Sequence, residues 1–290
     1  MFKTLVSMGL AAVLLGSVPS SAMAQDTKPV KLGWSAWADG EFVTKLAAKL
    51  IQDNYDQKVE LIQVDIAPLY QGVSRGDVDA MMMAWLPQTH ADYFARVKDK
   101  VDTLGTVYDG AKLGWAVPAY IPEDAISSIE DLKKDDVREK LKGRIEGIDP
   151  GAGLTRLSEA AVKDYDLNRY RLQISSEAGM LTTIDRAIRS DDWFVATLWS
   201  PHWAFGKYEL RYLDDPKNAL GEAEHVDILA RKGFKEDNPK VAEFLSRMKL
   251  PIEDLQNGMY EAQNTSYDQA IQSYIEKHPD QIKAWLGTAQ

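Results

Sequence analysis

Three tryptophans at strand ends are the residues in this sequence whose type and position best fit a chemical task. Trp85 and Trp199 each end an apolar run, Trp37 closely follows another, and each stands just before a polar or proline-containing segment. A single tryptophan at such a place more often fills a core, but three of them together indicate an aromatic box. Indole faces attract cations, including quaternary ammonium groups that have no N–H donors, by about 0.5–2 kcal/mol per contact. We therefore expect Trp37, Trp85 and Trp199 to bind such a cation.

A glycine-rich turn, Gly147–Leu154, is the strongest anion-binding signal in the chain. It follows an expected strand and opens an expected helix, where backbone N–H groups and the helix dipole favour an anion such as a carboxylate. It is not a dinucleotide fingerprint, because Arg156 stands where the third glycine should be, and no Lys-Ser or Lys-Thr follows as in a P-loop. The alternative is a tight turn without a ligand.

Motifs for catalysis or metal binding are lacking. The sequence has no cysteine, no nucleophile elbow and no pair of histidines with zinc-ligand spacing. The four histidines are His90, His202, His225 and His278. We therefore expect no metal, no cofactor and no enzyme activity. Taken one by one, His90 is typical of a surface or helix-capping histidine, Asp39 of a helix cap, and the run from Met81 to Met83 of a core strand.

The N-terminus and the charge restrict where the protein works and what it binds. Lys3 is followed by an apolar core from Leu5 to Leu15 and by a small-residue cleavage site, so residues 1–24 are predicted to be a secretory signal peptide. That core is too short to span a membrane. A formal net charge of −10 argues against nucleic acid and anionic membranes as partners. Without cysteine for a lipid anchor, we expect a freely soluble protein of a bacterial periplasm.

Short strand-like runs alternate with helical patterns along most of the chain, which predicts an α/β fold with parallel sheets flanked by helices. The expected strands cover residues 30–34, 59–64, 80–83, 114–117, 144–148 and 194–198. A helix is expected over 41–53, further helices carry apolar faces near Leu154 and Leu181, and everything from about Pro239 onward is expected to be helical.

Two breaks in this alternation predict two lobes. Residues 118–123 contain two prolines near a strand end, and residues 212–225 are punctuated by an Asp-Asp-Pro-Lys-Asn segment. If both segments cross between domains, the chain leaves a first domain, builds a second and returns. We therefore expect one lobe from residues 25–118 and 215–290, and a second lobe from residues 119–214.

These features resemble the periplasmic substrate-binding proteins of ABC importers for glycine betaine and proline betaine, over essentially the whole mature chain. The segments that carry the resemblance are Trp37–Asp39, Gly76–Ala80, Ala84–His90, Tyr108–Gly114, Asp149–Gly153 and Trp199–Trp203. The resemblance implies two α/β lobes that close over a ligand in the cleft between them. It implies that Trp37, Trp85 and Trp199 surround a quaternary ammonium group, and that the N–H groups of Gly153 and Leu154, with His90, hold a carboxylate.

The resemblance also implies a function, a partner and several alternatives. The protein would capture glycine betaine or a related zwitterion and deliver it to the membrane permease of an ABC importer. Choline-binding relatives have a fourth aromatic where Leu113 stands here, and they bind no carboxylate, which favours a zwitterion. Dimethylsulfoniopropionate and choline stay as alternative ligands, and an exported enzyme using His90 as its base is the alternative from another class. The roles of Trp34, Trp115 and Trp203 stay open, and Trp203 is also considered as a replacement or supplement for a box member.

Overall fold

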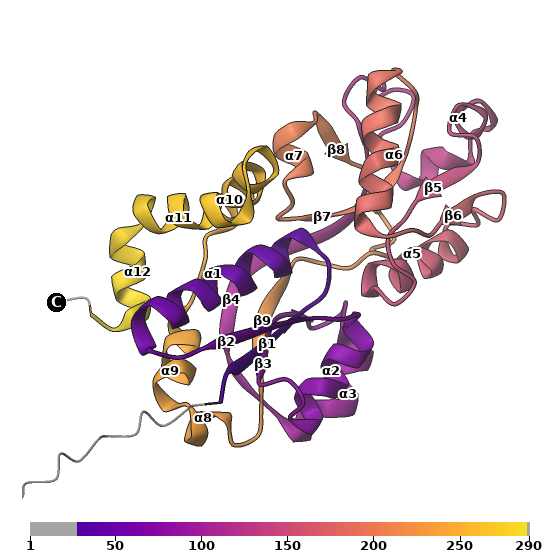
Figure 1. The fold of residues 1–290 in the computed structure, drawn as a ribbon. Helices are drawn as coiled ribbons and strands as arrows, with labels where there is room; N and C mark the ends of the chain where they lie inside the picture. Colours follow the sequence, from indigo (N-terminus) through magenta and orange to yellow (C-terminus); the bar gives the residue numbers. More distant parts are fainter. Residues whose placement is uncertain (1–27, 289–290) are drawn as a thin grey trace, which may run out of the picture.

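The computed structural model describes residues 28–288, so the predicted signal peptide lies outside the described residues. The molecule is elongated, with helices packed around a curved, mixed sheet (Figure 1). Its strands lie in the order β2-β1-β3-β9-β4-β7-β5-β6, and β8 pairs with β4. The strand bounds are β1 Val30–Trp34, β2 Val59–Gln63, β3 Ala80–Leu86, β4 Val101–Pro118, β5 Arg144–Glu146, β6 Arg171–Gln173, β7 Ala196–Ser200, β8 Leu210–Tyr212 and β9 Glu224–Arg231.

The long strand β4 belongs to two lobes. Up to Ala111 it pairs with β9, and from Lys112 it pairs with β7. We call the part built on β2, β1, β3, β9 and the start of β4 the first lobe, and the part built on the end of β4 with β5–β8 the second lobe. Strand β4 thus passes from one sheet to the other between Ala111 and Lys112, a few residues before the crossing expected at residues 118–123. The chain returns to the first lobe between Tyr212 and Glu224. The boundaries at residues 118 and 215 stay a prediction.

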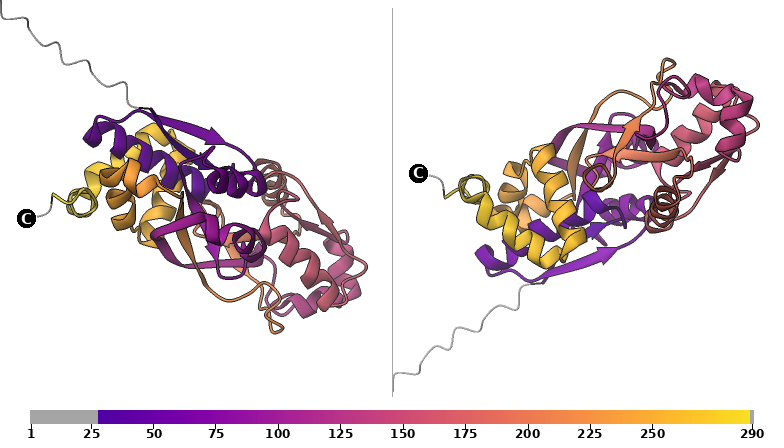
Figure 2. Two further views of the ribbon diagram at one scale, coloured as in Figure 1. Left: turned by 90° about the horizontal axis from the view of Figure 1, so that it is seen from below. Right: turned by 90° about the horizontal axis from the view of Figure 1, so that it is seen from above.

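Helices cover both lobes. In the first lobe α1 and the C-terminal helices lie together on one side of the sheet, and α2 and α3 lie on another; the second lobe carries α4 to α7 (Figure 1). Two further views show the second lobe at one end of the long axis and the C-terminal helices at the other (Figure 2). The helix bounds are α1 Ala38–Tyr55, α2 Ile66–Arg75, α3 Ala91–Val97, α4 Asp135–Lys140, α5 Gly153–Asp164, α6 Glu177–Arg189, α7 Ala204–Lys207, α8 Phe234–Asp237, α9 Pro239–Arg247, α10 Ile252–Asn264, α11 Tyr267–Lys277 and α12 Pro279–Leu286, with 3₁₀ turns at Lys98–Lys100 and Ile129–Lys133.

The expected parallel pairing is confirmed for part of the sheet only. Strand β1 is parallel to β2 and β3, and β5 is parallel to β6 and β7. The pairs β3·β9, β4·β9, β4·β7 and β4·β8 are antiparallel. Only β4 takes part in both lobes, whereas β9 pairs with β3 and with the first-lobe part of β4. The sheet is therefore mixed, while the all-helical C-terminal region from Pro239 is confirmed.

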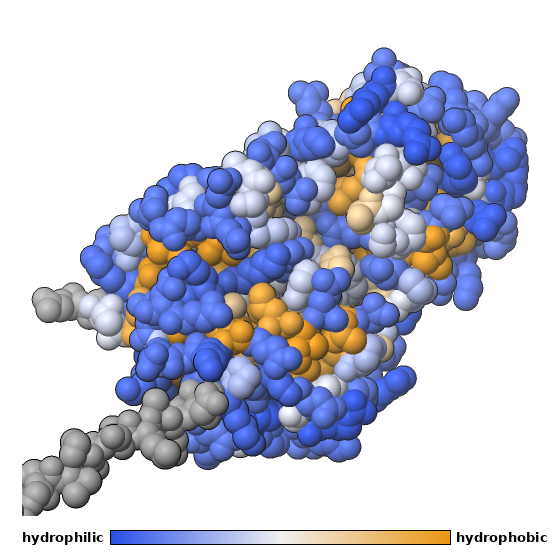
Figure 3. Space-filling model, viewed as in Figure 1, coloured by the Kyte–Doolittle hydropathy of each residue, from blue (hydrophilic) through white to orange (hydrophobic). Residues whose placement is uncertain are grey.

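Apolar side chains of the strands form the core. Met81, Met82 and Met83 are fully buried in β3, as expected for a core strand. On the face seen in Figure 3, hydrophobic residues gather mainly over the first lobe, whereas the surface of the second lobe is mostly hydrophilic. Across residues 28–288, no helix combines the length and the hydrophobicity that crossing a membrane requires.

Candidate functional site

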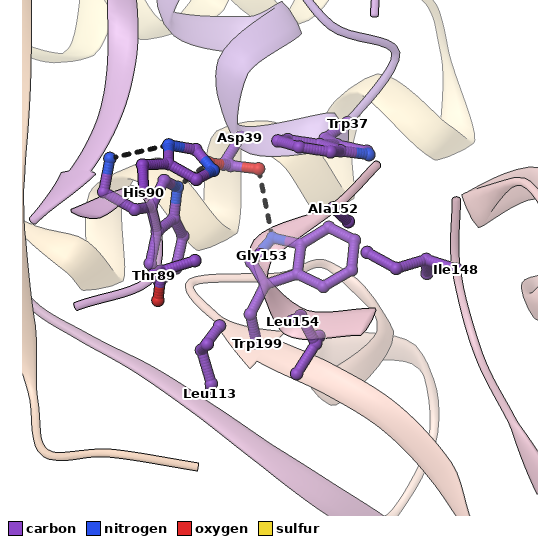
Figure 4. A pocket seen from close by; sticks show the side chains of 11 residues that line it. Trp37, Asp39, Thr89, His90, Leu113, Ile148, Ala152, Gly153, Leu154 and Trp199 are labelled. Atoms are coloured by element: carbon purple, nitrogen blue, oxygen red, sulfur yellow. Dashed lines mark hydrogen bonds between the residues drawn. The ribbon is translucent and has the colours of Figure 1, made fainter. Parts of the chain in front are cut away.

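All six residues expected to bind a ligand line one pocket between the lobes (Figure 4). The pocket has an empty volume of about 290 Å³ and is lined mainly by apolar side chains. Its lining residues are Trp37, Asp39, Trp85, Thr89, His90, Leu113, Ile148, Ala152, Gly153, Leu154 and Trp199. Residues up to Leu113 come from the first lobe or from the crossing strand β4, and the others come from the second lobe. The pocket is therefore complete only when the lobes are together.

One buried carboxylate orients two of the three indoles. Asp39 Oδ1 accepts a hydrogen bond from Trp199 Nε1 at 3.0 Å, and Oδ2 accepts from Trp85 Nε1 at 3.3 Å and from the Tyr108 hydroxyl at 2.6 Å. Asp39 is 1% exposed and lies in the first turn of α1, where the helix dipole stabilises its charge. The expectation that Asp39 is a helix cap was wrong, because Trp37 is the N-cap and the Asp39 side chain bonds to residues distant in sequence.

The third indole is held from the opposite lobe. Trp37 Nε1 donates to Asp149 Oδ2 at 2.9 Å, so a residue of the loop before α1 is fixed by a residue of the loop before α5. With all three indole N–H groups directed to carboxylates, the aromatic faces are left to contact a ligand. Indole faces carry negative potential, so the pocket suits a cation that lacks N–H donors.

His90 presents a neutral imidazole to the pocket. It is 1% exposed, and its Nδ1 accepts the backbone N–H of Trp85 at 3.2 Å. Burial, together with the nearby positive charge of Arg156, lowers the pKa of His90 to about 3, against the opposite effect of a hydrogen bond to the Met83 backbone. Because Nδ1 accepts from Trp85, we assign the proton of the neutral ring to Nε2, which lies on the pocket side of the ring in Figure 4. The expectation of a surface or capping histidine was wrong, because His90 makes no side-chain cap for α3 and is buried among aromatic rings.

The loop that carries His90 is fixed by an acid that the sequence analysis did not select. Glu224, at the start of β9, is 6% exposed. Its Oε1 accepts the N–H groups of Gln88 at 2.5 Å and Thr89 at 3.0 Å, and its Oε2 accepts the Thr89 hydroxyl. Sequence alone gave no signal for this role, because Glu224 is more than a hundred positions away and opens a strand that we did not predict.

The first turn of α5 forms the opposite wall of the pocket. Gly153 and Leu154 are its first two residues, and N–H groups at that position have no partner within the helix. A Cβ at Gly153 would collide with the Thr89 carbonyl oxygen, so glycine allows α5 to approach the His90 loop closely. The guanidinium of Arg156 also donates to the carbonyls of Gln88 at 3.1 Å and Thr89 at 3.3 Å. These contacts join the second lobe to the first beside the pocket.

The pocket thus combines two kinds of chemical group. Three indoles line it, and so do Gly153 and Leu154 of the first turn of α5 and His90, whose ring centroid lies 6.0 Å from that of Trp37. Indole faces suit a quaternary cation, and N–H donors suit a carboxylate. The lining therefore offers groups for both charges of a small zwitterion. Within the described residues, no group of three or more His, Cys, Asp or Glu is arranged to hold a metal ion.

The other tryptophans that the sequence analysis singled out do not line this pocket. Trp115 is fully buried and its Nε1 donates to Ser158 Oγ at 2.9 Å, which joins β4 to α5. Trp203 packs against His202, with the ring centroids 5.4 Å apart. Trp34 packs at the end of β1 with the Lys45 ammonium 5.7 Å from its ring.

Thr89, Ile148, Ala152 and Asp39 are lining residues that the sequence analysis did not assign to the site. Each lies within five positions of an assigned residue, so proximity to Trp37, His90 or Gly153 in the chain was the signal available. Leu113 entered the sequence analysis only through its comparison with an aromatic in choline-binding relatives. In the structure it lies on β4 and its side chain reaches the pocket (Figure 4).

Comparisons with known proteins show which family this chain resembles. A family model described as the substrate binding domain of the ABC-type glycine betaine transport system matches residues 28–277. The glycine betaine/carnitine transport binding protein GbuC of Listeria monocytogenes is 38% identical over 158 residues, which is 53% of this chain and 52% of that protein. This alignment thus spans about half the length of that relative.

Solved structures extend the similarity over most of the chain. Lactococcal OpuAC, in its closed conformation with glycine betaine, is 32% identical, with a TM-score of 0.81, and the match covers 89% of this chain and 99% of that one. An ABC-transporter choline binding protein in complex with choline is 25% identical, also with a TM-score of 0.81, over 90% of this chain and 92% of that one. Both have the two-lobed fold of substrate-binding proteins.

Proposed function

This chain belongs to the family of substrate-binding domains of ABC-type glycine betaine transport systems, and we propose that it binds glycine betaine or a close zwitterionic analogue between its lobes. The single observation that carries the proposal is that three indoles and the residues of three hydrogen-bond donors line the same interlobe pocket. In this proposal Trp37, Trp85 and Trp199 contact the quaternary ammonium group. Gly153, Leu154 and His90 donate to the carboxylate.

A zwitterion fits this pocket better than choline. Choline has a hydroxyl where glycine betaine has a carboxylate, so it would leave part of the donor set at the start of α5 without an acceptor. Buried donors left unsatisfied cost about 1–3 kcal/mol. Leu113 supplies an aliphatic rather than an aromatic wall. Dimethylsulfoniopropionate stays an alternative, because an apolar pocket separates ligands that differ by about one methylene only weakly.

A binding role fits this chain better than catalysis. The family consists of substrate-binding proteins of transporters. His90 is the only histidine that lines the pocket described here, and a base with a pKa of about 3 accepts a proton poorly at neutral pH. The exported-enzyme alternative therefore lacks a suitable base, and recovery of unchanged ligand after long incubation would count against it.

Delivery to a permease in the periplasm completes the proposal. The predicted signal peptide supports export, and membership of an importer family supports a membrane permease as the partner. The acidic composition, with a formal net charge of −10, does not disfavour a ligand with no net charge. Uptake of such a zwitterion would serve osmotic adaptation.

Titration calorimetry of the mature protein tests the ligand. We expect tight binding of glycine betaine, weaker binding of choline, and loss of about 1–2 kcal/mol or more of binding free energy in Trp85→Ala, since a cation contact and packing are both removed. Dimethylsulfoniopropionate is titrated in parallel. Tighter binding of choline than of either zwitterion would overturn the carboxylate site, and no binding of any of the three would overturn the proposed function.

A further inference from the structure

Glu177 joins the two lobes at a place outside the ligand pocket. It is the first residue of α6 in the second lobe, and it is 6% exposed. Its Oε2 accepts the backbone N–H of Ala38 at 3.1 Å, and its Oε1 lies 3.1 Å from His202 Nε2. Ala38 is the first residue of α1 in the first lobe, directly between Trp37 and Asp39. One carboxylate therefore bonds to both lobes, although it does not line the pocket.

His202 connects Glu177 to the aromatic box. It is fully buried, and its Nδ1 accepts the N–H of Ala204 at 2.9 Å. The neutral ring therefore has its proton on Nε2, which donates to Glu177. The edge of the His202 ring meets Trp199, with the ring centroids 4.5 Å apart and the planes at 89°. The contacts thus run without a gap from the first turn of α1, through Glu177 and His202, to a pocket indole.

We propose that Glu177 is a positioning residue that latches the two lobes in the closed state and, through His202, fixes Trp199 against the ligand. The inference rests on the proposed function, because it concerns the same closing pocket. Its role is separate from ligand contact, since Glu177 is not among the residues that line the pocket.

A carboxylate suits this position for a specific reason. Two N–H donors, one from each lobe, point at its two oxygens, and only an ionised acid offers two acceptors in this arrangement. The N-terminal end of the 18-residue helix α1 also favours the negative charge. Burial, and to a lesser extent the nearby negative charge of Asp39, oppose that charge and raise the pKa of Glu177, while the bonds from His202 and Ala38 act in the opposite direction. The Ala38 bond exists only with the lobes together, so it favours closure.

Two substitutions break the latch from opposite sides. Glu177→Gln keeps the size of the side chain but directs an NH₂ group at one of the two N–H donors. Ala38→Pro removes the N–H donor itself, and proline is accepted at the first position of a helix when the preceding residue is extended, as Trp37 is. In each variant we expect the dissociation rate of glycine betaine to rise about tenfold, because the lost hydrogen bond has a charged acceptor.

A double-mutant cycle tests whether the two substitutions act through one contact. In a Glu177→Ala background, Ala38→Pro should have almost no further effect on dissociation, because its partner is already gone. Glu146→Gln is the matched control, since Glu146 is equally buried at 6% exposure but lies on β5, where its nearest ionic partner is Arg144 of the same lobe. This control should dissociate at the wild-type rate.

Lobe closure is measured directly with spin labels at Gln52→Cys and Lys163→Cys, one exposed site on each lobe, in a chain that contains no other cysteine. With saturating glycine betaine, we expect wild type and Glu146→Gln to give one short distance, and Glu177→Gln to show an added longer one. Two results would overturn the latch, provided that wild type binds glycine betaine. One is a wild-type dissociation rate and a wild-type distance in Glu177→Gln. The other is that Ala38→Pro raises the dissociation rate as much in the Glu177→Ala background as it does alone. If wild type binds no zwitterion, the proposed function fails instead.

Discussion

At the scale of single residues, the orientation of the box depends on Asp39. Its two oxygens accept three hydrogen bonds, two of them from indoles of different lobes. A ligand that contacts Trp85 and Trp199 therefore meets rings whose directions are already set, and little side-chain entropy remains to be lost on binding. Asp39 thus orients two of the three indoles through their N–H groups, and Asp149 does the same for Trp37.

We predict that Asp39→Asn weakens both folding and binding. An amide offers one oxygen, so at least one indole N–H loses its acceptor, which should lower the free energy of unfolding by about 1–3 kcal/mol. Urea unfolding and calorimetry with glycine betaine check the two effects. Asp149→Asn is the matched comparison, because the Asp149 carboxylate accepts a single indole N–H, that of Trp37, and the asparagine oxygen can keep that bond. Equal losses in both variants would contradict the special role of Asp39.

A second prediction follows from the low pKa of His90. Because its pKa is about 3 when folded and near 6.5 when unfolded, its contribution to stability is fully present above about pH 6.5 and is lost as the pH falls towards 3. Relative to His90→Gln, wild type should lose up to about 1.4 kcal/mol of unfolding free energy per pH unit in that range. Urea unfolding at pH 7, 6 and 5 measures this. Parallel curves for the two proteins would mean that His90 titrates normally.

Both residues show where sequence reasoning stops. The residue types and the strand ends were sufficient to place Trp37, Trp85 and Trp199 in one pocket. Taken one by one, Asp39 and His90 were interpreted from their neighbours in the chain, which favoured a helix cap and a surface or helix-capping histidine. Only the family resemblance placed His90 at the carboxylate. Their actual partners are far away: Asp39 bonds to Trp85, Tyr108 and Trp199, and burial of His90 comes from tertiary packing. Glu224 and Glu177 escaped notice for the same reason.

At the scale of elements, closure requires the first turn of α5 to pack against the loop that carries His90. Gly153 makes that approach possible, and Arg156 adds hydrogen bonds from the same helix to carbonyls of the loop. The helix start thus has two roles, as donor of N–H groups to the pocket and as part of the contact between the lobes. Both roles require the same position of the first turn of α5, so a substitution that displaces this turn should weaken both the contact between the lobes and the binding of the ligand.

We predict that Gly153→Ala folds normally but binds glycine betaine about tenfold or more weakly. Alanine is accepted in a first helical turn, yet its Cβ would collide with the Thr89 carbonyl, and such overpacking typically costs about 1–3 kcal/mol. Calorimetry and thermal unfolding check this. Gly151→Ala is the control in the same turn, since a Cβ there would meet only the Tyr93 hydroxyl at 3.9 Å, an ordinary contact. Normal binding by Gly153→Ala would mean that α5 does not need this approach.

Elements were predicted unevenly from the sequence. Periodic helices such as α1 and the C-terminal helices were found, because one apolar face faces the core. Most of β4 and all of β9 were missed. In both strands, polar residues such as Asp109 and His225 interrupt the apolar pattern, and the strands are defined by long-range pairing with each other. The antiparallel centre of the sheet could therefore not be derived from local patterns, although the double crossing gave the two-lobed arrangement.

At the scale of the whole molecule, a ligand between the lobes should link their stabilities. The pocket takes side chains from both lobes, and interlobe bonds at Trp37, Tyr93, Arg156 and Glu177 surround it. A ligand that binds only the closed, folded state stabilises it by mass action, by about 2.7 kcal/mol at a free concentration of 100 times Kd. Because both lobes contact the ligand, that stabilisation should reach both of them rather than one.

We therefore predict that glycine betaine at about 100 times Kd raises the thermal midpoint of wild type by about 5 °C or more. Differential scanning calorimetry should show one sharper transition with ligand, since neither lobe can unfold without releasing it. Trp199→Ala, measured at the same ligand concentration, should show almost no rise, because it loses an indole supplied by the second lobe. An equal rise in Trp199→Ala would mean that glycine betaine acts as a general osmolyte excluded from the surface rather than as a ligand of the pocket. A rise in only one of two separate transitions would mean that the ligand binds a single lobe, which the shared lining of the pocket argues against.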